Sequence, residues 1–224
     1  MPRWGMVIDL DRCTACQACT VACKEENNQP VAGRVRSQRG RDIFWQQVLA
    51  TVEGDYPGVR VRFLPRPCQH CDAPPCVQVC PVGATTKRED GLVAQNSERC
   101  IGCRYCMVAC PYGVRAFNWK APAFETTQYL NPDVPVRPVG VVEKCTFCIH
   151  RIEKAVERAK AEGRPLKDGE VQTACMQTCT GGAIVFGNLD DPNSRVAKLA
   201  RERRAFRLLE ELATHPRVTY LAEG

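Results

Sequence analysis

The sixteen cysteines of this 224-residue chain fall in four runs of four, and none is left over. Two runs have the spacing CxxCxxCxxxC, one carries two extra residues before its third cysteine, and the last is split by a long insertion. Numbered one to four along the chain, the runs are Cys13, Cys16, Cys19 and Cys23; Cys68, Cys71, Cys76 and Cys80; Cys100, Cys103, Cys106 and Cys110; and Cys145, Cys148, Cys175 and Cys179. A chain with this pattern is expected to fold around what its thiols bind.

The spacing within a run is typical of [4Fe-4S] clusters. A tight loop with a thiolate every third residue can reach three iron atoms of one cubane, while the fourth thiolate lies too far along the chain. In two-cluster ferredoxins that fourth cysteine binds the neighbouring cluster, so the runs work in exchanged pairs. Four runs therefore predict four [4Fe-4S] clusters with all sixteen cysteines as iron ligands. Folding is expected to depend on cluster insertion, because such sites rarely exist in an unfolded chain.

Other uses of cysteine fit the pattern less well. Structural zinc sites usually take two CxxC pairs separated by a spacer, not four thiolates within eleven residues. Disulfides are disfavoured because cysteines three residues apart bridge poorly and because disulfide scaffolds are typically short secreted chains. A mixed filling, in which one site holds a [3Fe-4S] cluster or zinc, stays open.

Composition excludes several classes of function. The formal charge of +6 is modest, and bound clusters would offset it, so nucleic acid is not expected as a partner. No apolar run approaches the eighteen residues of a membrane span, and no apolar stretch of a signal peptide precedes Cys13. Catalytic triads, paired carboxylates and phosphate-binding loops are also not evident. The chain is therefore not expected to be an enzyme by itself.

An internal repeat organises the chain. Short apolar strands are predicted before three of the runs, at 6–10, 92–94 and 139–142, and further strands follow the fourth cysteine of three runs in PVGATT, PYGVRAF and TGGAIVF. A unit of strand, cluster loop, short helix and strand is typical of ferredoxin-like modules. The predicted fold class is α+β, with two such modules in one chain followed by a C-terminal helix and an extended tail.

Three further elements are predicted outside the repeat. Apolar residues at helical spacing indicate a helix at 149–162 within the insertion of run four. A possible strand at 44–51 lies in an otherwise exposed connector. After a turn and helix cap at 190–194, apolar spacing predicts a helix from Ser194 to Ala213, and 215–221 is interpreted as an extended tail. This helix and tail are expected to pack either on their own domain or on a partner, so they are candidate partner contacts.

We make specific predictions for two residues next to cysteines of the runs, His70 and Thr180. His70 lies within run two, and we expect its side chain to face solvent rather than a cluster sulfur. Thr180 follows the last cysteine of run four, where Pro81 and Pro111 follow their runs, so its backbone N–H is a candidate donor to a cluster sulfur.

Four segments resemble the four-cluster electron-transfer subunits of molybdopterin oxidoreductase complexes, the group that includes dimethyl sulfoxide, polysulfide and tetrathionate reductases. They are CQHCDAPPCVQVCPVGAT, RCIGCRYCMVACPYGVRAFNW, GVVEKCTFCIHRI and ACMQTCTGGAIVFGNLDDPNS. Details such as LNPDVPVR and DDPNSRVAKL are most similar to the iron-sulfur parts of alternative complex III and related quinone reductase complexes. The resemblance covers nearly the whole chain.

The resemblance implies how the cysteines are shared. Runs one and four form one module, over 1–33 and 135–189, and runs two and three form the other, over 60–134, with 190–224 as the C-terminal helix and tail. The implied ligand sets are Cys13, Cys16, Cys19 and Cys179; Cys145, Cys148, Cys175 and Cys23; Cys68, Cys71, Cys76 and Cys110; and Cys100, Cys103, Cys106 and Cys80. Some relatives lack the second cysteine of run three and hold a [3Fe-4S] cluster, but Cys103 is present here, so a full cubane is expected.

The resemblance also implies a role without catalysis. The chain would pass electrons between a large catalytic subunit, of the molybdopterin type, and a multi-span membrane subunit that interacts with quinone. It would have no membrane span of its own and would be held at the membrane by these partners, on the periplasmic side if a partner's signal carries it there and otherwise on the cytoplasmic face. Alternatives are a freestanding polyferredoxin and an electron-transfer subunit of a hydrogenase or tungsten oxidoreductase.

Overall fold

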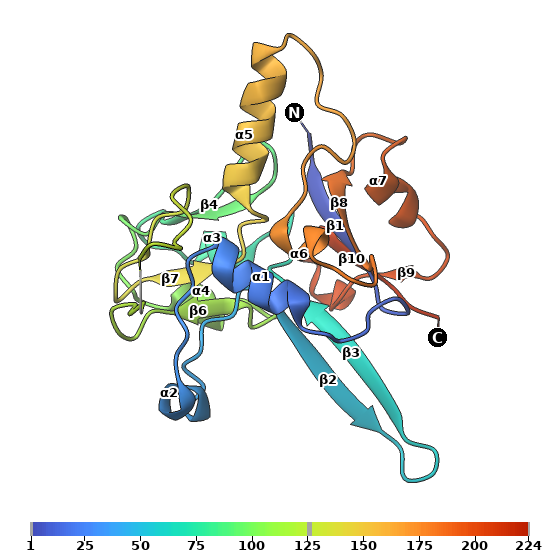
Figure 1. Ribbon diagram of the computed structural model, residues 1–224, viewed down its shortest axis with the longest axis horizontal. Coiled ribbons are helices and arrows are strands. Elements are labelled where there is room, and N and C mark those ends of the chain that lie inside the picture. Colours follow the sequence, from blue (N-terminus) through green and yellow to red (C-terminus); the bar gives the residue numbers. More distant parts are fainter. Residues whose placement is uncertain (1, 125–126, 224) are drawn as a thin grey trace.

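The computed structural model describes residues 2–124 and 127–223 as short strands and helices arranged around the cysteine runs (Figure 1). Its four-stranded sheet has the order β8-β1-β10-β9. The strands are β1 (Trp4–Asp9), β8 (Ile184–Asn188), β10 (Val218–Leu221) and β9 (Ala205–Phe206). Strand β1 pairs antiparallel with β8 and parallel with β10, so Met6 lies opposite both Phe186 and Val218. The two ends of the chain therefore meet in one sheet.

The core beside this sheet is aromatic. All six residues of β1 are buried, as expected for a largely apolar strand that is covered on both faces. Trp4 stacks on Phe186 with ring centroids 5.4 Å apart, and Phe147 meets Phe186 edge-on at 5.2 Å. Because Phe147 lies within run four, the aromatic core holds a cysteine loop against the sheet.

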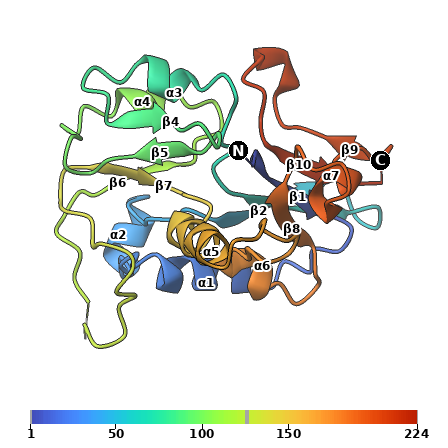
Figure 2. The same cartoon turned by 90° about the horizontal axis from the view of Figure 1, so that it is seen from above.

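Three two-stranded ribbons complete the strands. They are β2 (Gln47–Glu53) with β3 (Arg60–Arg66), β4 (Thr85–Lys87) with β5 (Val93–Gln95), and β6 (Arg115–Phe117) with β7 (Val142–Lys144). The β2/β3 hairpin projects from the body and is exposed toward its tip (Figure 1). Figure 2 shows the two smaller ribbons on one side of the molecule and the four-stranded sheet on the other.

Most of the described helices are short, and half of them carry cysteines of the runs. They are α1 (Ala18–Glu26), α2 (Arg34–Gln38), α3 (Pro75–Gln78), α4 (Tyr105–Val108), α5 (Ile149–Ala161), α6 (Ala174–Gln177), α7 (Arg195–Leu199) and the 3-10 helix η1 (Glu210–Leu212). Helices α1, α3, α4 and α6 each carry cysteines of one run. No helix in the two described ranges is long and apolar enough to cross a membrane.

The predicted repeat is confirmed. Strands β1, β5 and β7 precede runs one, three and four, and β4, β6 and β8 follow runs two, three and four, although β7 begins only at Val142 and the predicted strand spans 139–142. The insertion helix is also confirmed as α5, which buries Ile152, Ala155 and Ala159. The strand predicted at 44–51 is present as β2, displaced toward the hairpin turn. The module boundaries stay a prediction, and the β6/β7 ribbon joins segments on either side of the boundary proposed at 134–135.

The predicted C-terminal helix is wrong in its extent. The cap is correct, because the Ser194 hydroxyl accepts a hydrogen bond from the Ala197 N–H, but α7 ends at Leu199. Further along, Phe206, Leu209 and Leu212 remain exposed, so their helical spacing does not mark a buried face.

Long-range contacts shape this segment instead. Arg204 forms ion pairs with Asp9, at the end of β1, and with Asp11, and these pairs hold the segment after α7 next to β1. The predicted extended tail becomes the buried strand β10, paired with β1 and β9. The end of the chain therefore completes the main sheet and is not a free appendage.

Candidate metal centres

The four cysteine runs share one backbone feature. The residue before the second cysteine has a left-handed conformation in every run, at Ala15 (φ 55°), His70 (φ 42°), Gly102 (φ 70°) and Phe147 (φ 56°). Residues other than glycine rarely adopt this conformation, so its repetition at equivalent positions indicates a common loop. The loop turns the chain within two residues and brings successive thiols toward the same space.

Gly102 is required for a second reason. A Cβ atom at this position would lie 2.2 Å from the carbonyl oxygen of Gly140, in the turn before β7. Glycine therefore lets run three pack directly against the backbone that leads into run four.

Four groups of thiols are brought together across the runs. Group A contains Cys13, Cys16, Cys19 and Cys179; group B contains Cys23, Cys145, Cys148 and Cys175; group C contains Cys68, Cys71, Cys76 and Cys110; and group D contains Cys80, Cys100 and Cys106, to which we assign Cys103 because it lies in the same loop. Each group combines thiols from two runs, in the combinations that the family resemblance implies. The assignment of every cysteine as an iron ligand stays a prediction.

Electrostatic coupling between thiols reveals groups A and B. Burial raises the pKa of Cys13, and the neighbouring Cys179 and Cys16 thiols raise it further. Burial likewise raises the pKa of Cys23 well above its ordinary value, and the thiols of Cys145, Cys148 and Cys175 add to the rise. The last cysteine of run one thus lies with run four, and the last cysteine of run four lies with run one.

Groups C and D show the same exchange between runs two and three. Burial raises the pKa of Cys71 to about 12, and the thiols of Cys68, Cys76 and Cys110 contribute. Burial also raises the pKa of Cys106, against the opposing Arg115 guanidinium and with contributions from Cys100 and Cys80. Cys103 lies in the same loop as Cys100 and Cys106 and is exposed.

Electrostatic coupling between neighbouring groups gives them an order. The Cys19 thiol of group A contributes to the raised pKa of Cys175 in group B. The Cys68 thiol of group C likewise contributes to the raised pKa of Cys145 in group B. Arg115 connects the last pair, because it acts on Cys76 of group C and on Cys106 of group D. The order is therefore A, B, C, D.

The ends of this order reach the surface, while its middle does not. Cys16 of group A and Cys103 of group D are exposed. The thiols of group B are all buried, and so are three of the four thiols of group C. The two ends of the order are therefore accessible to solvent, and the middle groups are shielded from it.

Backbone amides point at the sulfur atoms in three of the four groups. The N–H groups of Ala84 and Thr85 donate to Cys80 Sγ at 3.2 and 3.4 Å, and the N–H of Ala183 donates to Cys179 Sγ at 3.2 Å. Further amide donors reach Cys100, Cys145 and Cys148. Such donors stabilise thiolates and tune the potential of a cluster bound to them.

Polar side chains add donors at Cys23 and Cys16. Asn27 and Gln29 donate to Cys23 Sγ at 3.7 and 3.5 Å. The hydroxyl of Thr180 lies 3.5 Å from Cys16 Sγ, and this contact lowers the pKa of the thiol. The contact made by Thr180 is thus through its hydroxyl, where the sequence suggested its backbone N–H.

Arg115 is a buried cation that the sequence did not single out. Its Nη1 donates to Thr85 Oγ1 at 3.3 Å and to Gln95 Oε1 at 3.0 Å, which fixes the guanidinium between groups C and D. Its Nη2 is buried without a hydrogen-bond partner among the described residues. Burial alone would lower its pKa, but the charges of Cys76 and Cys106 outweigh burial and raise it. The only sequence signal was a basic residue inside an otherwise apolar strand.

His70 does not face solvent, so that prediction is wrong. Its side chain is fully buried and stacks on Phe147 with centroids 3.9 Å apart. Nδ1 accepts a hydrogen bond from the Val93 N–H, and Nε2 therefore carries the proton and donates to the Cys145 carbonyl at 3.1 Å. Burial lowers the pKa of His70 well below its ordinary value. A neutral imidazole thus links run two to run four.

The donor sets fit iron-sulfur clusters. A small enclosed cavity lies among the four thiols of group B, beside Asn27 and Phe147. Raised pKa values would keep such buried thiols protonated, whereas bound metal deprotonates a coordinating thiol. Within residues 2–124 and 127–223, no three Cys, His, Asp or Glu side chains are arranged to hold a single metal ion. When bound, clusters would supply one-electron redox chemistry.

Comparison with known proteins agrees with this chemistry. The 4Fe-4S dicluster domain family matches residues 59–132, and the 4Fe-4S binding domain family matches residues 4–25. The menaquinone reductase iron-sulfur cluster-binding subunit of Nitratidesulfovibrio vulgaris is 50% identical over 230 residues, which cover 98% of this chain and 89% of that protein.

Other relatives span nearly all of this chain. The Hdr-like menaquinol oxidoreductase iron-sulfur subunit 1 of Archaeoglobus fulgidus is 42% identical, over 99% of this chain and 84% of the relative. The arsenate respiratory reductase iron-sulfur subunit of Shewanella sp. is 36% identical, over 98% of this chain and 96% of the relative. The chain therefore belongs to the iron-sulfur electron-transfer subunits of molybdopterin oxidoreductases, binds [4Fe-4S] clusters and is not itself the catalytic subunit.

Proposed function

We propose that the chain carries four [4Fe-4S] clusters, one in each of groups A to D, and conducts electrons along them. The observation that carries the proposal is the order of the groups, with buried thiols in the middle and exposed thiols at both ends. A row of clusters needs neighbours close enough for electron transfer and an accessible centre at each terminus. All sixteen cysteines are the proposed iron ligands.

The partners follow from the family. We propose a large catalytic subunit of the molybdopterin type at one end of the row and a multi-span membrane subunit that interacts with quinone at the other. Relatives named as menaquinone reductase and menaquinol oxidoreductase subunits support the quinone connection. The chain would then be held at the membrane by its partners.

Metal analysis of the purified complex tests the cluster count. Four cubanes require about sixteen iron atoms and about sixteen acid-labile sulfides per chain. Zinc in place of iron, with negligible sulfide, would refute the proposal. Purification from native membranes tests the partners, because a freestanding polyferredoxin would be recovered alone with its clusters, whereas a complex subunit would be recovered with a catalytic and a membrane subunit.

A further inference from the structure

A pocket near group D is lined by cationic and aromatic side chains. We define the basic pocket by Arg36, Arg39, Arg41, Lys120, Phe117 and Trp119. We propose that the basic pocket binds an acidic segment of the protein that exchanges electrons with the group D cluster. This inference rests on the proposed function, because it assigns a docking site to one end of the row of clusters.

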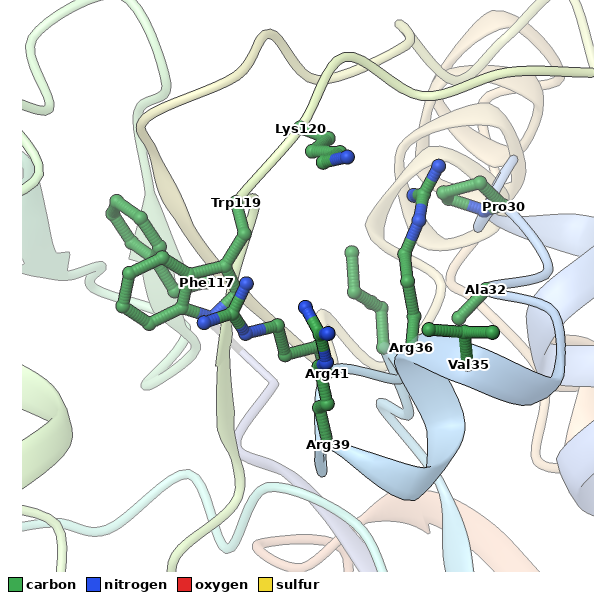
Figure 3. A pocket seen from close by; sticks show the side chains of 10 residues that line it. Pro30, Ala32, Val35, Arg36, Arg39, Arg41, Phe117, Trp119 and Lys120 are labelled. Carbon is green, nitrogen blue, oxygen red and sulfur yellow. The ribbon is translucent and has the colours of Figure 1, made fainter.

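Two segments far apart in the sequence form the basic pocket. Helix α2 supplies Arg36, the loop after it supplies Arg39 and Arg41, and β6 with its following residues supplies the two aromatic side chains and Lys120. Figure 3 shows the cationic side chains gathered around one space, with the aromatic pair at its edge.

The charge of the basic pocket is not neutralised by the described residues. All ionisable side chains that line it are basic, and within residues 2–124 and 127–223 none of the four is in an ion pair. Some other arginines do have a carboxylate partner, as Arg151 has in Glu26 and Arg217 in Asp72. Like charges held together repel one another, and carboxylates supplied by a partner would relieve that repulsion.

Cation-π contacts connect the basic pocket to the cluster loop. The guanidinium of Arg41 lies 5.1 Å from the ring centroid of Trp119, and that of Arg104 lies 4.9 Å from the same ring. Arg104 directly follows the exposed Cys103 and also lies over Phe117. A partner seated in the basic pocket would therefore be beside the exposed end of group D.

Apolar residues on the same loop favour a protein as the occupant. Ile101, Tyr105 and Val108 are 64%, 56% and 83% exposed, around Cys103 and Arg104. Exposed apolar groups combined with arginine and aromatic side chains are typical of protein interfaces. A small anion would use the charge and leave these apolar side chains in water.

Charge reversal in the basic pocket tests the proposal in the intact complex. The variant Arg36→Glu/Arg39→Glu should lower recovery of the partner that docks at group D at least tenfold, while the chain keeps its iron and its cluster spectrum. Neither arginine is in an ion pair or a ring contact within the described residues, so folding should be preserved. Arg36→Gln/Arg39→Gln, which removes charge without reversing it, should give a smaller loss that grows with salt.

The matched control is Arg201→Glu/Arg203→Glu, in the exposed turn after α7. It changes net charge equally and should leave the complex intact. Zero-length carbodiimide coupling of the wild-type complex should join the Lys120 amine to a partner carboxylate, and Lys120→Gln should remove that cross-link. Normal recovery of both variants together with no cross-link at Lys120 would overturn the proposal.

Three outcomes would contradict the proposals in different ways. If the wild-type chain binds vesicles containing phosphatidylglycerol, the Arg36→Glu/Arg39→Glu chain does not, and the complex is unchanged, the basic pocket binds lipid and the proposal is overturned. If the wild-type chain is recovered from native membranes with no partner at all, the proposed function fails together with the docking site. A stable wild-type complex that is insensitive to the variants would overturn the docking site alone.

Discussion

A substitution of Arg115 should change the reduction potentials of two of the proposed clusters at once. It is buried, is positioned by Thr85 and Gln95, and acts on sulfur atoms of groups C and D. A cation at this position would stabilise the reduced, more negative state of the clusters proposed at groups C and D. Its effect does not depend on contact with any substrate, so Arg115 is a positioning and tuning residue.

Arg115→Gln should lower the reduction potentials of the clusters in groups C and D by on the order of 100 mV, because a nearby charge is removed. Arg115→Lys, which keeps the charge, is the control and should retain most of the potential. Redox titration followed by electron paramagnetic resonance measures both. A uniform shift of all clusters, or none, would show that Arg115 does not act locally.

Cys103 offers a second test at the residue scale. If it is a ligand in group D, Cys103→Ala should remove one iron and convert that cubane to a [3Fe-4S] cluster with a distinct paramagnetic signal. The exposure of Cys103 means that the substitution leaves no buried cavity behind. An unchanged spectrum with a full complement of iron would remove Cys103 from the ligand set.

At the scale of elements, the cysteine loops depend on backbone conformation as much as on thiols. Four runs of different sequence share a left-handed residue before the second cysteine, which explains how short loops present several thiols to one space. Helix spacing and cysteine spacing are local patterns, so α5 and the repeat could be predicted from sequence. The contact between Gly102 and Gly140 joins two loops and could not.

Gly102→Ala should destabilise the loop of run three by about 1–3 kcal/mol, because the new Cβ combines an unfavourable φ with a close contact to a carbonyl. Gly140→Ala is a matched control, since Gly140 also has positive φ but nothing lies within 4 Å of the position that a Cβ atom would take there. The temperature at which cluster absorbance is lost should fall more for Gly102→Ala. An equal fall in this temperature for both variants would mean that the positive φ, and not the contact with the Gly140 carbonyl, accounts for the destabilisation.

At the scale of the whole molecule, the features that the sequence could not predict depend on contacts between residues far apart in the chain. The apolar spacing of Phe206, Leu209 and Leu212 suggested a helix, but these side chains are exposed. An ion pair between Arg204 and Asp9 instead holds the segment beside β1, where β9 pairs with β10 in the sheet. The burial of His70 likewise depends on Val93 of β5 and on Cys145 of run four, both distant in the sequence. The family resemblance implies ligand sets that combine thiols from two runs, and the assignment of each cysteine to a cluster stays a prediction.

The end of the chain also joins the sheet to run two. The guanidinium of Arg217, just before β10, donates to Asp72 Oδ1 at 2.5 and 2.8 Å and to the Asp90 carbonyl at 3.0 Å. Its backbone N–H donates to the Gln69 carbonyl at 2.9 Å. Thr214 adds a hydrogen bond to Tyr112, in the segment after run three. These contacts tie the C-terminal segment to the loops around group C.

Truncation after Ala213 should therefore cost clusters and not merely a partner. It removes β10, leaves the backbone edges of β1 and β9 that pair with β10 without a partner, and takes Arg217 away from Asp72. The truncated chain should retain less iron than the full chain when purified anaerobically, because folding and cluster binding are coupled. Truncation after Ala222, which spares the whole strand, is the control and should retain full iron. Equal iron in both would mean that the main sheet is dispensable for holding the clusters.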